Sequence, residues 1–290
     1  MRNVSNSHIR SLAFLRLNTH FGRVAMLSLA NLLPLFSIYL CLLPLTDVAD
    51  TRNSFANAGS SLLLALALMA LSYALMCVML TGTHRGLQQL AEDQPVKGGV
   101  LFSRIRHALG SIGLPLWIYV KTYVWALPGE AVVLLGTSLM LSSPGFFATL
   151  VRIAGFILMY ALMIPAALRY SMAHYVFAEH PELGVYDAVE RSKDIMCYRK
   201  WQLFCLNLPY VLGIVGIWAV MAGVFLVAGG VGPTAMVGFV GWLLIMLTVA
   251  AIAGTVYLLL LSVMATACYY NAHKPQPAPE QEEAPAQPAE

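Results

Sequence analysis

Charged residues are scarce in this chain. Of its 290 residues only 11% are Asp, Glu, Lys or Arg, whereas 59% are hydrophobic, and the formal net charge is +3. Soluble domains carry about 25% charged residues, so this composition excludes an ordinary water-soluble protein. The small positive charge gives no reason to expect nucleic-acid binding, because basic loops facing anionic lipid account for it.

Motifs that carry chemistry are missing as well. The five cysteines include no C-x-x-C pair, and the seven histidines include no H-E-x-x-H. Neither a G-x-S-x-G turn nor a phosphate-binding glycine loop occurs. Carboxylate pairs and nucleophile–base pairs are equally lacking at either end of the apolar blocks described next. We therefore expect no metal, no cofactor, no catalytic residue and no enzymatic activity.

What the chain does contain is long apolar blocks. Six can be delimited, at 24–45, 59–80, 115–139, 145–168, 203–229 and 235–265. About 20 apolar residues suffice to cross a hydrocarbon core of about 30 Å as a helix. Blocks without period-2 alternation satisfy their backbone hydrogen bonds in lipid as helices. The sequence therefore predicts an all-α, polytopic membrane helix bundle with about six transmembrane helices and amphipathic cytoplasmic helices.

The basic residues fall mainly on one side of this predicted topology. They lie before the first span, in the connections after the second and fourth spans, and after the sixth span. These residues are Arg2, Arg10, Arg16, Arg23, Arg85, Lys97, Arg104, Arg106, Arg169, Arg191, Lys193, Arg199, Lys200 and Lys274. Because basic loops stay on the cytoplasmic side, both termini are expected in the cytoplasm.

Three regions follow from this pattern. Residues 1–23 interleave aromatic and aliphatic residues with arginines, which favours a cytoplasmic, interfacial helix. Residues 24–270 are expected to form the integral membrane domain. Residues 271–290 are rich in Pro and Glu, with no large apolar residue after Lys274, and are expected to form a disordered cytoplasmic tail.

Two ionisable residues lie inside predicted spans, where a charge is costly and usually has a role. If the third and fourth spans turn near 142–144, Glu130 and Arg152 both lie about 12 to 15 Å deep. The pair is a candidate intramembrane ion pair, either structural or part of a substrate or proton pathway. Lys121 approaches the cytoplasmic interface, where its stem can snorkel.

The connection after the fourth span contains a charged segment with helical periodicity. Pro181 suits the first turn of a helix, and one narrow apolar face follows, formed by Val185, Ala188, Val189, Ser192, Ile195 and Met196. The opposite face is predicted to pair Asp187 with Arg191 and Glu190 with Lys193. We interpret 181–196 as a cytoplasmic interaction helix lying on the bundle or the bilayer.

The residues around this segment resemble a known family. Arg169-Tyr170-Ser171-Met172, the run 178–184 (AEHPELG), Arg191-Ser192-Lys193 and the run 200–204 (KWQLF) are similar to bacterial six-span integral membrane proteins of unknown function. That family is distantly similar to the membrane domain of some glycerophosphodiester phosphodiesterases. This chain differs at Cys197-Tyr198, where family members commonly have a glycine. The resemblance implies a six-span fold and residence in the bacterial inner membrane, and it assigns no catalytic residue.

Function is less constrained than fold. The favoured hypothesis is a non-enzymatic protein that binds or organises membrane components through its cytoplasmic helices, with the lipid bilayer and a membrane-protein partner as its contacts. The alternative is a small-solute or lipid transporter, for which Glu130 and Arg152 would line a wet cavity.

Overall fold

A computed structural model describes residues 5–34, 37, 55–143, 145–229 and 239–274. These residues contain helices and no strand, so the predicted all-α fold is confirmed. The α-helices are α1 (Asn6–Thr19), α2 (Phe21–Ala30), α4 (Phe55–Ala91), α5 (Ala108–Ser142), α6 (Phe146–Tyr170), α7 (Ala173–Glu179), α8 (Gly184–Met196), α9 (Lys200–Gly229) and α10 (Phe239–His273). Three short 3-10 helices, η1 (Gly98–Phe102), η2 (Ile105–His107) and η3 (Pro181–Leu183), lie in the connections.

Five helical stretches are long and apolar enough to cross a membrane, and they make this a multi-pass membrane protein. They correspond to five of the six predicted blocks. The remaining block, 24–45, begins in α2, but residues 35–36 and 38–45 lie outside the described part of the chain, so the predicted span is not tested over its full length. Several helices also extend well past the predicted blocks, because α4 and α10 continue into polar sequence that packs against other helices.

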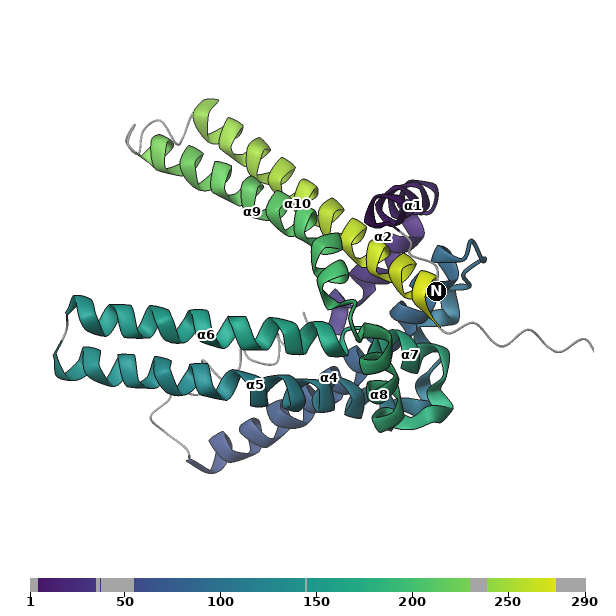
Figure 1. Cartoon of the computed structure of the whole chain (residues 1–290), viewed down its shortest axis with the longest axis horizontal. Helices are drawn as coiled ribbons and strands as arrows, with labels where there is room; N and C mark the ends of the chain where they lie inside the picture. Colours follow the sequence, from purple (N-terminus) through teal and green to yellow (C-terminus); the bar gives the residue numbers. More distant parts are fainter. Residues whose placement is uncertain (1–4, 35–36, 38–54, 144, 230–238, 275–290) are drawn as a thin grey trace, which may run out of the picture.

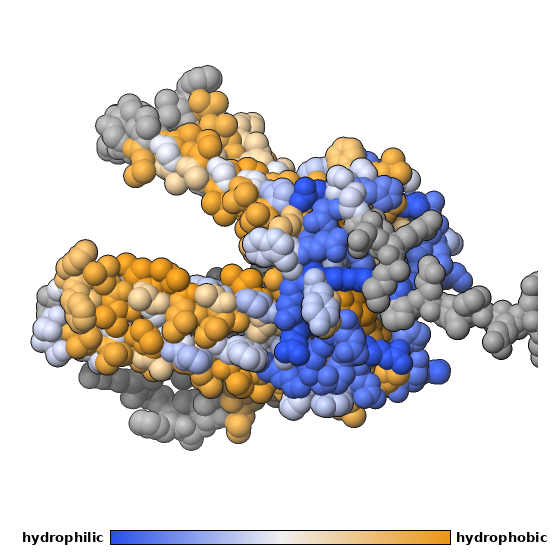
Figure 2. Space-filling model, viewed as in Figure 1, coloured by the Kyte–Doolittle hydropathy of each residue, from blue (hydrophilic) through white to orange (hydrophobic). Residues whose placement is uncertain are grey.

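The molecule divides into a polar head and apolar arms. We define the head as α1, α7, α8, the connection 92–107 and the adjoining ends of α4, α5, α9 and α10. From it project the hairpin α5–α6 and the hairpin α9–α10, which diverge with distance from the head (Figure 1). Hydrophilic residues gather over the head, and hydrophobic residues cover both hairpins (Figure 2).

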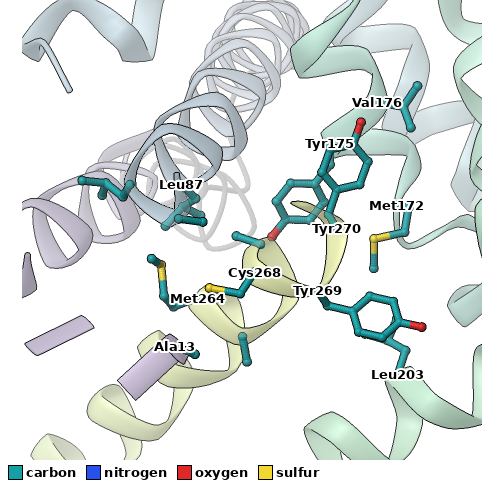
Figure 3. Close-up of a cluster of buried hydrophobic side chains, with 14 of the residues drawn as sticks. Ala13, Leu87, Met172, Tyr175, Val176, Leu203, Met264, Cys268, Tyr269 and Tyr270 are labelled. Carbon is teal, nitrogen blue, oxygen red and sulfur yellow. The ribbon is translucent and has the colours of Figure 1, made fainter. Parts of the chain in front are cut away.

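Most of the fully buried side chains belong to the head. Leu17 of α1, Leu87 and Leu90 of α4, Phe177 of α7 and Met196 of α8 share one continuous core. Figure 3 shows the centre of this core, where side chains from the end of α10 meet residues of α1, α4, α7 and α9. The head is thus packed like a small soluble domain, and it joins the arms into one unit.

In the arms the closest packing lies within the α5–α6 hairpin. A Cβ atom added at Gly129 would lie 2.3 Å from the Cα of Met159, and one added at Gly136 would lie 2.6 Å from the backbone N of Arg152. One added at Gly155 would similarly lie 2.6 Å from the backbone N of Val133. Small residues let two helix backbones approach this closely in a membrane.

Candidate functional site

The predicted interaction helix is present, and its apolar face holds it to the head. Pro181 begins the 3-10 turn η3, and Gly184 then adopts φ +75°, so α8 begins at Gly184 and not at the expected Pro181. A positive φ is easily adopted by glycine, which makes this residue the break between the two helices. The residues Ala188, Val189, Ser192, Ile195 and Met196 are buried, as their spacing predicts.

Ser192 adds a specific polar contact to this apolar face. Its hydroxyl donates to the backbone oxygen of Arg169 at 3.1 Å. Arg169 lies in the last turn of α6, where the carbonyl groups have no partner within the helix. The hydroxyl of α8 therefore caps α6, which fixes the interaction helix relative to the membrane hairpin.

The charged face of α8 points outward. Lys193 pairs with Glu190, as predicted, and this hydrogen bond is the main reason that the pKa of Glu190 lies below its ordinary value. Asp187 and Arg191 do not form the expected pair. Both are exposed, as is Asp194, and none of the three side chains has a hydrogen bond or ion pair to another described residue.

Lys121 connects this helix to the membrane arm. Its ammonium group lies 5.1 Å from the ring centroid of Trp117 and 5.5 Å from that of Tyr186 in α8. Contacts between a cation and aromatic rings at this range are attractive. The contact with Tyr186 places Lys121 at the junction of the head and the α5–α6 hairpin, which is the interfacial position that the sequence suggests.

The other two predicted site residues are not brought together. Glu130 accepts a hydrogen bond from the hydroxyl of Tyr123. Arg152 instead points its guanidinium group at the sulfur of Met140, 3.5 Å away. No ion pair joins Glu130 and Arg152 in the structure as described.

The register of the α5–α6 hairpin explains this separation. The close approaches of Gly129 to Met159, Gly136 to Arg152 and Gly155 to Val133 all indicate the same antiparallel register. In that register Glu130 is level with Leu158, six residues from Arg152, so their depths differ by about 9 Å. The turn lies where the sequence places it, between Ser142 and Phe146, but Glu130 precedes the end of α5 by 12 residues whereas Arg152 follows the start of α6 by only 6. The predicted depth match is therefore wrong.

A polar cluster that the sequence did not reveal lies where α4, α7 and α10 meet. Lys274 donates to Glu92 at 2.6 Å and to Glu179 at 3.0 Å, and Tyr270 donates to Glu179 at 2.8 Å. Burial lowers the pKa of Lys274, but the bonds to Glu92 and Glu179 outweigh it, so the net shift is upward. The ring of Tyr270 also stacks on Tyr175 (Figure 3).

Two further side chains bind backbone carbonyl groups of α7. Gln88, which is 2% exposed, donates to the backbone oxygen of Tyr175 at 2.8 Å. Arg104 donates to the backbone oxygen of Ala178 at 2.6 Å. A cation is favourable at a helix C-terminus because the free carbonyl groups carry partial negative charge. These contacts position the short α7 at the centre of the head.

The N-terminal helix makes a related contact with α9. Proline has no N–H, so Pro209 leaves the backbone oxygen of Cys205, four residues earlier, without its helical donor. The guanidinium group of Arg10 donates to that oxygen and to the oxygen of Leu206. No local sequence signal connects positions 196 residues apart, so this contact was not predicted.

A metal centre has no support in the described residues, where no group of three or more His, Cys, Asp or Glu side chains could hold an ion. The rings of His84 and His174 do stack, with centroids 5.2 Å apart. A stacked pair cannot direct two ring nitrogens at one ion, and a third ligand is lacking among these residues.

Comparisons with known proteins add no functional information. No protein-family model, no curated protein and no solved structure matches this chain.

Proposed function

We propose that this chain is a non-enzymatic organiser of the bacterial inner membrane, which recruits a partner protein to the cytoplasmic face through the charged side of α8. In this arrangement the head and both termini are cytoplasmic, as the distribution of basic residues favours. The observation that carries the proposal is the state of α8. Its apolar face is buried and capped onto α6, while the side chains of Asp187, Arg191 and Asp194 on its outer face have no hydrogen bond or ion pair to another described residue.

The outer charges form an ordered stripe. Asp187, Arg191 and Asp194 are spaced i, i+4 and i+7, so they follow one line on the helix surface. An alternation of acid, base and acid does not suit adhesion to anionic lipid, which favours a basic face. It suits a protein surface with the opposite alternation, because charge complementarity selects a partner and its register.

Photo-crosslinking in living cells tests this proposal. A photoreactive amino acid placed at Asp187 or Arg191 should capture one dominant protein, whereas the same residue at Leu109, which is 87% exposed elsewhere on the head, should not. The double reversal Asp187→Lys with Asp194→Lys should reduce capture at Arg191 at least about tenfold. The matched reversal Lys97→Glu, away from α8, should leave capture unchanged.

The identity of the captured protein completes the test. Reversing its facing basic residues to Glu should restore capture by the Asp187→Lys, Asp194→Lys chain. Two results would overturn the proposal. One is that the amount of captured protein stays the same after the charge reversals on either protein. The other is that no protein is captured at Asp187 or Arg191 in a larger amount than at Leu109.

Transport of a small solute or a lipid is the alternative function. One observation favours it, namely that Glu130 is a partly exposed carboxylate within a span. Transport requires that the purified protein in vesicles moves a solute or lipid between compartments, and that Glu130→Gln abolishes this flux. Flux by the native chain that Glu130→Gln removes would replace the organiser proposal.

A further inference from the structure

A polar stripe runs along the membrane face of α5. Tyr119, Tyr123, Glu130 and Thr137 are spaced by four, seven and seven residues, so at 100° per residue they lie within about 40° of one another. Tyr119 is 64% exposed and Tyr123 is 39% exposed. Thr137 is exposed and Glu130 is partly exposed. The stripe runs over 19 residues of helix, from Tyr119 to Thr137, or about 27 Å, which is nearly the full hydrocarbon thickness.

Glu130 lies near the middle of this stripe and near the middle of the bilayer. It follows Lys121, which marks the junction with the head, by nine residues, or about 14 Å. A carboxylate accepts up to about four hydrogen bonds, and Glu130 receives one from the described residues, the bond from Tyr123. A carboxylate at this depth is costly unless a further donor or cation reaches it.

Arg152 does not need the same explanation. It is level with Gly136, fifteen residues from Lys121 along α5, which is about 22 Å from the head-side interface. That depth leaves less than about 8 Å to the opposite interface, so its long side chain can snorkel to the headgroups. Glu130 has a shorter side chain and lies too deep to do so.

We propose that this stripe recognises a transmembrane helix of another protein that carries a basic side chain near the bilayer midplane. The cation of that helix would complete the hydrogen bonding of Glu130, while the exposed rings and Thr137 would contact the rest of its length. A polar surface of about 27 Å along a helix matches a second helix in extent, which a small ion or solute does not. The stripe is separate from α8 and extends the proposed function into the membrane.

A second copy of this chain fits the stripe poorly. Copies inserted in the same direction place equal residues at equal depth, so Arg152 of one copy would miss Glu130 of the other by about 9 Å. Lys121 would miss it by about 14 Å. Among the described residues, no other Lys or Arg lies between Lys121 and Arg152 in this hairpin. The partner is therefore a different protein.

Binding of a synthetic helix in lipid vesicles tests the proposal directly. The probe is a helix of about 20 leucines with one central lysine; the comparison helices have either no lysine or the lysine displaced by two turns. Energy transfer between a dye on the exposed Cys197 of the full chain and a dye on the helix measures association. The central-lysine helix should bind the native chain about tenfold more tightly than either comparison helix.

Two variants locate the binding surface. Glu130→Gln keeps the shape of the side chain and should reduce binding of the central-lysine helix to the all-leucine level. Arg152→Gln makes the same kind of change outside the stripe and should leave binding unchanged. Equal binding of all three helices to the native chain overturns the proposal even if Glu130→Gln fails to fold, and so does full binding by a folded Glu130→Gln chain.

Discussion

Two consecutive helices bury very different fractions of their surface. Five of the seven residues of α7 are buried, whereas four of the 25 residues of α6 are buried. Both are apolar, but α7 lies in the head and α6 spans the membrane. Water forces an apolar helix to bury its side chains against protein, whereas lipid tails solvate them equally well. The head therefore needs a packed core, and the arms need contacts only where two helices touch.

The two regions also use polar contacts differently. In the head, Gln88 and Arg104 bind the end of α7, and Ser192 caps α6. Each links segments distant in sequence. In the arms most polar bonds are local, such as those from Thr248 and Thr255 to carbonyl groups four residues earlier. Specific long-range structure is thus concentrated in the head, and Glu130 is an exception that calls for an outside partner.

The largest predicted effect breaks the one tightly packed region of the arms. In Gly129→Val the new Cβ would lie 2.3 Å from the backbone of Met159, so α5 and α6 must separate. We expect destabilisation of roughly 3 kcal/mol or more and little folded protein. Gly223→Val is the control, because nothing lies within 4 Å of its added Cβ. Gel filtration of the purified variants measures the folded yield. Equal yields would show that the hairpin is not closely packed.

The second effect tests how the head holds a membrane arm. Arg10→Met should cost about 1 to 3 kcal/mol, because it leaves the carbonyl oxygen of Cys205 without a donor. In Pro209→Ala the restored N–H can satisfy Cys205, so Arg10→Met should cost less in that background. Unfolding of the four chains in a double-mutant cycle measures the coupling. Additive losses would refute a link between Arg10 and the proline.

The sequence predicted these two regions unequally. Apolar block length was enough to predict five of the six spans among the described residues, and 3.6-residue periodicity was enough to predict the buried face of α8. The turn of the α5–α6 hairpin also lies where the sequence places it, but Glu130 is farther from that turn than Arg152 is, so the predicted ion pair was wrong. The contact of Arg10 with the proline break was missed because it depends on how α1 packs onto α9, which no local sequence signal contains.

A smaller effect is predicted at the entry to α9. Tyr198 is fully exposed and has φ +63°, a conformation that costs a non-glycine residue about 1 to 2 kcal/mol. Tyr198→Gly removes this strain and should raise the unfolding free energy by about 1 kcal/mol. The gain is reduced because glycine gives the unfolded chain more backbone entropy. Thermal unfolding measures the change, and a lower melting temperature would contradict the strain at this residue.

The smallest effect is a pH dependence confined to the head. The hydrogen bonds from Arg16 and then His20 hold the pKa of Asp93 below its ordinary value of 3.8. A lowered pKa in the folded state stabilises the protein above the ordinary value, and this stability is lost as the pH falls through the folded value. The melting temperature should therefore fall slightly below about pH 4, and Asp93→Asn should weaken that dependence. An identical acid profile in Asp93→Asn would exclude this contribution.

The contrast between a fixed head and separate hairpins can be measured directly as distances. In a cysteine-free background reconstituted in lipid, spin labels at Leu141 and Leu226, both exposed on the distal parts of the two hairpins, report their separation. A second pair at Leu109 and Asp187 reports on the head. We expect a long, broad distance distribution between Leu141 and Leu226 on the two hairpins. Between Leu109 and Asp187 in the head we expect a narrow distribution. A short and narrow distribution between the hairpins would show a closed bundle and would contradict this expectation.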